Sequence, residues 1–196
     1  MSATIVAQGH ARPWHDAGEV HAAMRQIEKR AAGTRFGGTA WLFRQVDGPD
    51  VLLLVADWDI SPGFGDSAGT IDGTPTFDAL CVGDIQRSVF RRRSVAELSW
   101  KTAVIDCTIV RAPSAARGVV QAVSEQVLNP AVSALPGFVL RHSYQDVDNP
   151  DRFLTVEGWD SAAAMESFLH HMAPRLTKSL SRLGATVERF VGQAPV

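Results

Sequence analysis

Two tryptophans stand at the ends of apolar runs, each followed by an aspartate: Trp58 in "VLLLVADWD" and Trp159 in "RFLTVEGWD". On an extended strand Thr155, Glu157 and Trp159 share one face, because side chains alternate. An indole N–H can bond a substrate carbonyl, and a carboxylate can take up a proton. Trp159 and Glu157 are therefore candidate catalytic residues, with Thr155 and Trp58 as candidate substrate contacts. The alternative is that both tryptophans only pack a helix against a sheet.

A histidine and a tyrosine occupy alternate positions of the stretch "FVLRHSYQ". On a strand, His142 and Tyr144 share a face with Leu140 and Phe138, while Arg141 points the other way. Imidazole exchanges protons near neutral pH, which makes His142 a candidate general base. Tyr144 is a candidate substrate contact. A hydrogen-bonded core histidine is the alternative interpretation.

Two adjacent histidines, His170 and His171, lie among residues with the spacing of an apolar helix face, namely Met165, Phe168, Leu169 and Met172. His171 falls at the flank of this face, where it can reach a cavity edge, and His170 falls in solvent. Neighbouring helix residues point apart, so the pair cannot hold one metal ion. His171 is a candidate catalytic residue, with a plain surface position as the alternative. Phe168 and Met172 are candidate substrate contacts.

Other motifs point to no cofactor. The stretch "GFGDSAG" is glycine-rich, but no helix pattern comes after it to receive a phosphate. The chain has no P-loop, no flavin fingerprint and no Ser/His/Asp elbow. Its two cysteines, Cys81 and Cys107, lack the spacing of a metal site. We therefore expect no cofactor and no metal.

Composition narrows the class of protein. The chain has 196 residues, of which 45% are hydrophobic and 20% charged, and a formal net charge of -2. This charge argues against nucleic acid as a partner, because phosphate binding needs a basic excess. No apolar run reaches the length of a membrane helix, and the N-terminus does not resemble a signal peptide. We expect a reduced, cytoplasmic protein with no membrane partner.

The candidate residues belong to an internal repeat. Residues 45–59 and 146–160, 101 positions apart, are identical at eight of fifteen places. Glycines at positions 83 and 184 keep the same offset. We therefore expect a first unit over residues 1–96 and a second unit over residues 97–196.

The second unit gives the clearer pattern. Strands are predicted over residues 102–111, 138–145, 152–159 and 185–192, with a hairpin turn at "DVDNPD". A first helix begins after Pro113, with Val120, Val123 and Val127 at helical spacing. A second helix begins after Asp160 and Ser161 and bends or breaks at Pro174. This order is β-α-β-β-α-β, that of a ferredoxin-like unit.

The first unit has the same order until its second helix. That helix is replaced by a Gly/Pro-rich loop or lid over residues 61–76, with a short helix predicted near Phe77 to Cys81. The strand "VLLLVA" is apolar on both faces, so both should be covered. We predict an α+β fold in which two ferredoxin-like units with antiparallel sheets are fused into an α+β barrel.

The passages "FVLRHSYQDVDNPDRFL" and "VEGWDSAAAMESFL" resemble the antibiotic biosynthesis monooxygenase (ABM) family, in which the third strand ends in Trp before an acidic residue, Ser and a helix. The family fold is a dimeric α+β barrel made by two chains. Here the duplication would supply both halves, as a pseudo-dimer that could also form a homodimer. The resemblance covers the second half and, in outline, the first.

The resemblance implies a cofactor-independent monooxygenase that oxidises a polycyclic aromatic, anthrone-like polyketide with O₂. Family members of this kind use a strand-end Trp, which corresponds to Trp159, usually with an Asn that is absent here. Haem-degrading members use an Asn on the first strand and a Trp and a His on the second helix. At those places this chain has Asp106, Cys107 and Phe168, which counts against haem degradation. A polyketide cyclase-like activity and a non-catalytic, small-molecule-binding barrel are the alternatives.

Overall fold

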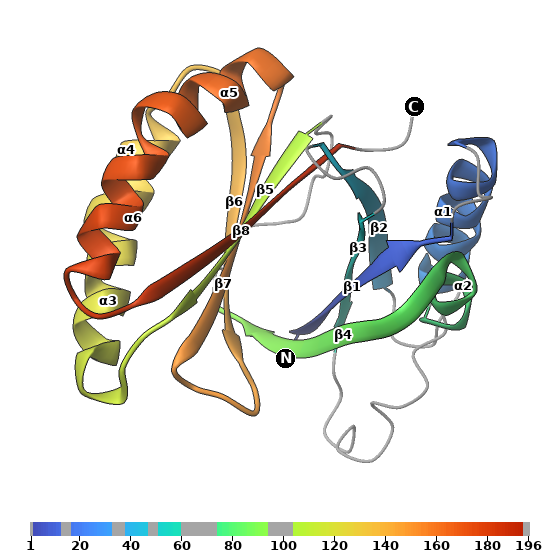
Figure 1. The fold of residues 1–196 in the computed structure, drawn as a ribbon, viewed down its shortest axis with the longest axis horizontal. Helices are drawn as coiled ribbons and strands as arrows, with labels where there is room; N and C mark the ends of the chain where they lie inside the picture. The colour runs from blue at the N-terminus through green and yellow to red at the C-terminus, as the bar shows by residue number, and fades with distance from the viewer. Residues whose placement is uncertain are drawn as a thin grey trace. The chain divides into compact units, whose positions relative to one another are not determined.

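The computed structural model describes residues 2–12, 17–32, 38–46, 51–59, 74–93 and 104–193. The chain divides into two compact units, one built on residues up to Arg92 and the other on Arg93–Gly192. Figure 1 shows the elements of both. Each unit combines an antiparallel sheet with helices, so the predicted α+β class with ferredoxin-like units is confirmed.

The described residues of the first unit form four strands in the order β4-β1-β3-β2. Their bounds, with those of the helices, are β1 Ser2–Ala11, α1 Ala17–Ala32, β2 Gly38–Gln45, β3 Val51–Asp59, α2 Thr74–Leu80 and β4 Cys81–Arg92. Helix residues Val20, Ile27 and Phe77 pack with strand residues such as Leu42 and Leu54 in one buried cluster. The predicted short helix is present, but it ends at Leu80, and Cys81 opens β4 instead.

Two predictions for the first unit concern residues or side chains that lie outside the described part of the structure. Most of the Gly/Pro-rich loop falls outside the described residues. Trp58 lies on β3, where its backbone pairs with Ala3 and Gly38, but its side chain is outside the description. Its predicted contact with a substrate therefore stays a prediction.

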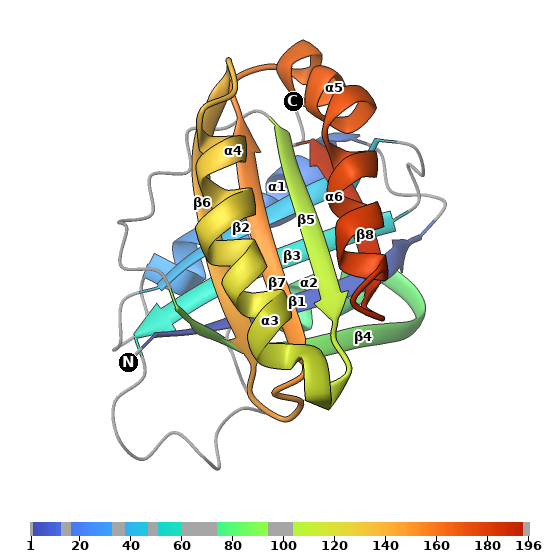
Figure 2. The ribbon, with the colours of Figure 1, turned by 90° about the vertical axis from the view of Figure 1, so that its left-hand side faces the viewer.

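The second unit has its strands in the order β8-β5-β7-β6. The strands are β5 Val104–Arg111, β6 Phe138–Asp146, β7 Arg152–Trp159 and β8 Thr186–Gln193. The helices are the short 3₁₀ turn Ser114–Ala116, α3 Arg117–Val123, a π-helical turn Ser124–Leu128, α4 Asn129–Ser133, α5 Ala162–His171 and α6 Ala173–Ser181. Figures 1 and 2 show the helices of this unit on one face of its sheet.

Because of the π-helical turn, the first helix of the second unit buries other residues than its sequence spacing predicts. In an uninterrupted α-helix, Val120, Val123 and Val127 would lie on the same buried face, as their spacing predicts. The π turn adds a residue and so rotates the rest of the helix by about 100°. Leu128 and Val132 are buried in place of Val127, whose exposed fraction is 57%.

The second helix forms as predicted and is broken at Pro174 into α5 and α6. Ser161 is the N-cap of α5: its hydroxyl oxygen accepts a hydrogen bond from the Ala164 N–H at 3.3 Å. Met165 and Phe168 are buried, with Leu169 and Met172 packed beside them. Gly137 has a φ of 77°, and a Cβ there would collide with Ala164 and Asp160. This glycine lets the start of β6 approach α5 closely.

Candidate functional site

The helix-covered face of the second sheet carries Trp159 at its end. Trp159 is fully buried and stacks on Phe168 of α5, with ring centroids 5.0 Å apart and planes at 25°. Phe138 meets the indole edge-on, with centroids 5.8 Å apart. The indole Nε1 is buried and has no hydrogen-bond partner among the described residues. The packing role predicted for Trp159 is therefore present, together with an unused N–H donor.

Four charged side chains form a row across this face, one from each strand. We call Arg189 of β8, Asp106 of β5, Glu157 of β7 and Arg141 of β6 the charged row. Asp106 and Arg141 are the register partners of Glu157 on its two sides. Side chains that face each other across antiparallel strands have Cβ atoms about 5 Å apart. The two carboxyl groups are therefore neighbours, with an arginine at each end.

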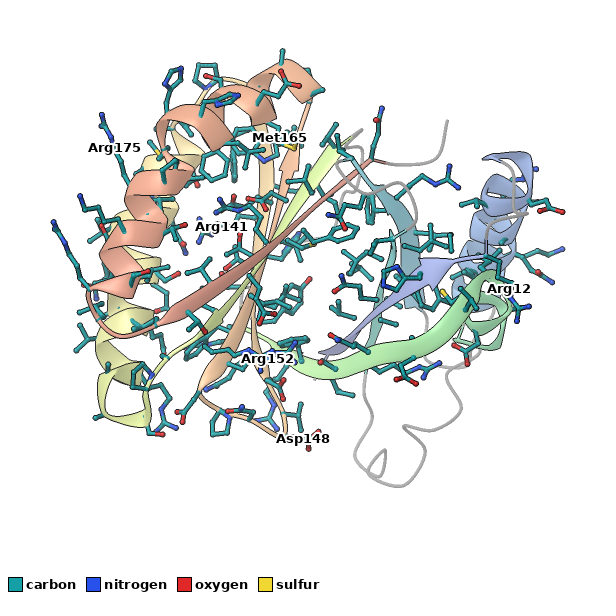
Figure 3. All side chains as sticks on the ribbon, viewed as in Figure 1. Arg12, Arg141, Asp148, Arg152, Met165 and Arg175 are labelled. Carbon is teal, nitrogen blue, oxygen red and sulfur yellow. The ribbon has the colours of Figure 1, made fainter. Side chains whose placement is uncertain are left out.

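Short contacts join the charged row in two pairs. Arg141 Nη1 donates to Glu157 Oε1 at 2.7 Å. Arg189 Nε lies 3.1 Å from Asp106 Oδ2 and donates to the Thr108 hydroxyl at 3.2 Å. The Arg141 Nε has no partner among the described residues, although its side chain is only 10% exposed. Figure 3 shows Arg141 between the sheet and the helices.

Burial changes the proton affinity of both carboxyl groups. Asp106 is fully buried, and desolvation raises its pKa from 3.8 to about 7, against the opposing effect of Arg189 and with a further rise from Glu157. Desolvation also raises the pKa of Glu157, against the effects of Arg141 and Arg189. A carboxyl group of this kind can exchange a proton near neutral pH.

A pocket of about 460 Å³, the outer pocket, opens beside this cluster. Its walls come from the loop before β6, the start of α5 and the junction of α5 with α6. The lining residues include Gly137, Ser161, Phe168, His171, Met172 and Arg175. The volume lies within the roughly 300–1,000 Å³ typical of small-molecule sites. The side chain of Arg175 points away from the α6 ribbon (Figure 3).

A second space, the inner cavity, lies behind Phe168. It measures about 30 Å³, the space of one water molecule. Its lining includes Thr108, Arg141, Thr155, Glu157, Phe168 and Arg189. Phe168 thus lines both spaces, and the Cζ atom of Arg189 lies 5.6 Å from its ring centroid.

Seven of the predicted site residues lie in three different places in the structure. Phe168, His171 and Met172 line the outer pocket, and Thr155 and Glu157 line the inner cavity. His142 and Tyr144 are buried on the opposite face of the sheet, where they pair with Val156 and Leu154. His142 is thus not on the side of the sheet that carries Trp159 and Glu157.

A shift of register in β6 explains why one predicted face is wrong. The pairing with β7 slips between Phe138 and Leu140, so Phe138 pairs with Trp159 while Arg141 pairs with Glu157. Phe138 therefore shares a face with Arg141, and not with His142 as simple alternation predicts. Asp106, Arg141 and Arg189 are site residues that the sequence patterns did not predict. A charged residue inside an apolar strand, as in "VIDCTIV", is the signal that could have identified Asp106.

The described residues contain no group of three or more His, Cys, Asp or Glu side chains placed to hold a metal ion. No helix in the described parts of the chain has the length and apolar character that crossing a membrane requires.

Comparison with solved structures supports the fold. A candidate monooxygenase from Fusobacterium nucleatum superposes with a TM-score of 0.73 at 10% identity, covering 100% of this chain and 93% of that one. An anthrone oxidase-like protein gives 0.69 at 11% identity, with 98% and 91% covered. A haem-degrading enzyme from Listeria monocytogenes gives 0.58 at 11% identity, with 98% and 99% covered. At these identities the likeness concerns the fold alone.

A family model matches part of the second unit. No curated protein gives a significant match. The family model for antibiotic biosynthesis monooxygenases matches residues 109–174, which run from the end of β5 to the start of α6 and include Trp159, Glu157 and Phe168. The resemblance to the antibiotic biosynthesis monooxygenase family that the sequence motifs predict is therefore confirmed for this segment.

Proposed function

We propose that the second unit is a cofactor-independent monooxygenase, which oxidises a polycyclic aromatic substrate of the anthrone type with O₂. The observation that carries this proposal is the outer pocket of about 460 Å³, which lies within the segment matched by the family model and its flanks. Three residues predicted from the sequence, Phe168, His171 and Met172, line it. An aromatic and a thioether side chain offer the flat, apolar contact that fused rings need.

The proposed chemistry uses the reactivity of the substrate itself. A base removes one proton from the CH₂ group of the central ring, and the electron pair of that C–H bond stays on the substrate. The carbanion gives one electron to O₂, and the radical and superoxide combine into a peroxide. Loss of the second C–H proton with cleavage of the O–O bond gives the ketone and water. In sum, CH₂ and O₂ become C=O and H₂O.

The protein would contribute a dry site and hydrogen-bond donors for the developing negative charge. Trp159, stacked on Phe168 at the edge of the outer pocket, orients the substrate ring through Phe168. Glu157 and His171 are the predicted proton acceptors on this side of the sheet, because His142 lies on its other face. A monooxygenase of this type needs no metal or flavin, since the substrate supplies the electrons.

The test is aerobic incubation of the whole chain with anthrone, in which quinone absorbance and O₂ uptake are both measured. We expect quinone formation above the buffer rate and about one O₂ consumed per quinone. S167W, which fills the outer pocket from α5, should abolish turnover. S179W places the same bulk on an exposed position of α6 that does not line the pocket, and is the matched control.

Each alternative has its own outcome. Quinone formation at the buffer rate contradicts the proposal. A cyclised polyketide formed without O₂ would identify a cyclase, and tight binding of anthrone without turnover would identify a binding protein. A shift of the haem Soret band on titration would favour haem chemistry instead.

A further inference from the structure

The two carboxyl groups at the centre of the charged row face each other across β5 and β7 on the buried side of the sheet. The exposed fraction is 0% for Asp106 and 4% for Glu157. Two buried carboxylates at this spacing repel each other, so one of them tends to keep a proton. The arginines at the two ends, Arg141 and Arg189, prevent both from being neutral at once. We therefore expect the Asp106 and Glu157 carboxyl groups to share one proton.

The surroundings of the charged row lack an acceptor for two buried donors. The Arg141 Nε and the Trp159 Nε1 have no hydrogen-bond partner among the described residues, and Arg141 lines the inner cavity. Buried N–H groups nearly always have a hydrogen-bond partner. An oxygen atom that enters the inner cavity would accept the hydrogen bond for which the Arg141 Nε has no acceptor among the described residues. A ketone or enolate oxygen of the substrate has this chemistry.

We propose that the Asp106–Glu157 pair is the catalytic base of the second unit, and that it is reached from the outer pocket when the Phe168 ring swings aside. The proposal rests on the proposed function and deepens it, because it names the group that takes the proton. Phe168 is the shared wall of the outer pocket and the inner cavity, so its movement joins the two spaces.

The proton is conserved in this step. The substrate C–H bond breaks, its electron pair stays on the substrate as the enolate, and the proton forms an O–H bond on the pair, which has lost its own proton above about pH 7 and now shares this one. The Arg141 guanidinium lies beside the new negative charge and stabilises it. The pair later gives its proton to the peroxide anion. It then takes up the second C–H proton as the O–O bond breaks, and passes that proton to the leaving hydroxide, which becomes water and leaves the pair ionised again. O₂ is the oxidant throughout.

The pair suits this task better than His171. His171 is exposed at the mouth of the outer pocket, where water competes for the substrate anion. The pair is shielded from water by the helices, and desolvation brings the pKa of Asp106 to about 7. A base whose pKa lies near the working pH combines correct ionisation with useful strength.

The first arm of the experiment measures kcat/KM with anthrone against pH in the full chain. We expect D106N and E157Q each to lose about 100-fold or more, and the wild type to show a limb near pH 7 that D106N lacks. H171Q should lose less than about tenfold. D146N is the matched control, because Asp146 is also a buried aspartate paired with an arginine, Arg152, at 2.9 Å, but at the distant β6–β7 turn.

The second arm monitors the carboxyl proton itself, without turnover. Infrared difference spectra of folded protein should show a protonated-carboxyl band that disappears as pH rises through about 7 and is absent in D106N. If H171Q is inactive while D106N keeps wild-type kcat/KM, the base is not the pair and the proposal is overturned. If the wild type itself has no turnover, the proposed function fails, and the absence of a titrating band would also rule out the shared proton.

The variant F168L tests the path by which the substrate reaches the Asp106–Glu157 pair, separately from the role of the pair as the base. A smaller side chain at this position opens the wall between the two spaces while keeping an apolar surface. We expect kcat to be maintained or raised about two- to fivefold while KM for anthrone rises, because ring stacking is lost. A loss of kcat equal to that of E157Q would show that Phe168 is needed as a fixed surface, which contradicts its role as a movable wall.

Discussion

Trp159 of β7 stacks on Phe168 of α5 at a centroid distance of 5.0 Å, and the same Phe168 ring lines both the outer pocket and the inner cavity. The strand-end tryptophan therefore does not line the outer pocket itself. Its indole instead packs against the Phe168 ring, which does line that pocket. This contact is the packing role of Trp159, and its proposed functional role rests on the same contact.

Replacing Trp159 should affect both stability and activity. We expect W159F to lower the free energy of unfolding by about 1–3 kcal/mol, since it removes buried volume and leaves a cavity. It should also lower kcat/KM for anthrone, because the Phe168 ring loses the indole on which it stacks when it closes the wall of the outer pocket. Urea unfolding and steady-state kinetics would measure the two effects. A destabilised W159F with unchanged kinetics would show that the contact is structural only.

The stability of the second unit should depend on pH through Asp106. Its pKa is raised by burial from 3.8 to about 7 in the folded state, so the folded protein binds the proton more tightly than the unfolded chain. The stability from this group is complete below about pH 4 and is lost as pH rises towards 7, at up to about 1.4 kcal/mol per pH unit.

The variant D106N removes this dependence, because asparagine is neutral at every pH. Compared with the wild type, it should gain stability at about pH 8 relative to about pH 5. Chemical unfolding of both proteins at the two pH values gives this difference directly. An identical pH dependence in the two proteins would mean that Asp106 does not change its ionisation on folding.

The order of elements in the second unit could be predicted from sequence patterns because each pattern has a local cause. Ser161 caps α5, Pro174 divides α5 from α6, and "DVDNPD" turns the hairpin. The register slip in β6 and the π-helical turn at Ser124–Leu128 had no local signal that alternation or helical spacing detects. Tertiary packing decides both, and each one changed which side chains face the site.

Breaking the Arg141–Glu157 ion pair from one side should be costly. R141M leaves Glu157 buried without its guanidinium partner, and we expect a loss of about 3–5 kcal/mol at pH 8. The double variant R141M/E157L should recover most of this loss, since apolar side chains replace both charges. The free energies of unfolding of the two variants test this. Equal losses in the single and double variants would contradict the pairing.

The hydroxyl of Ser161 should stabilise the start of α5 and with it the wall of the outer pocket. S161A removes the acceptor for the Ala164 N–H, and we expect a cost of about 1 kcal/mol. S161T keeps the acceptor and should stay within about 0.5 kcal/mol of the wild type. If S161A is as stable as S161T, the cap contributes nothing measurable.

The charged row could not be predicted from the pattern of one strand. Glu157 was identified because it lies two residues from Trp159 on the same strand face. Its partners Asp106, Arg141 and Arg189 come from three other strands, and only the pairing register brings them together. A site assembled across strands depends on register, which the pattern of any single strand cannot supply.

We propose that the second unit uses O₂ to oxidise an aromatic substrate in the outer pocket. The most direct measurement is O₂ uptake by the full chain with anthrone, with S167W and S179W assayed beside it. We predict uptake in step with quinone formation in the wild type and S179W, and background uptake in S167W. Background uptake by all three proteins would contradict the proposed function.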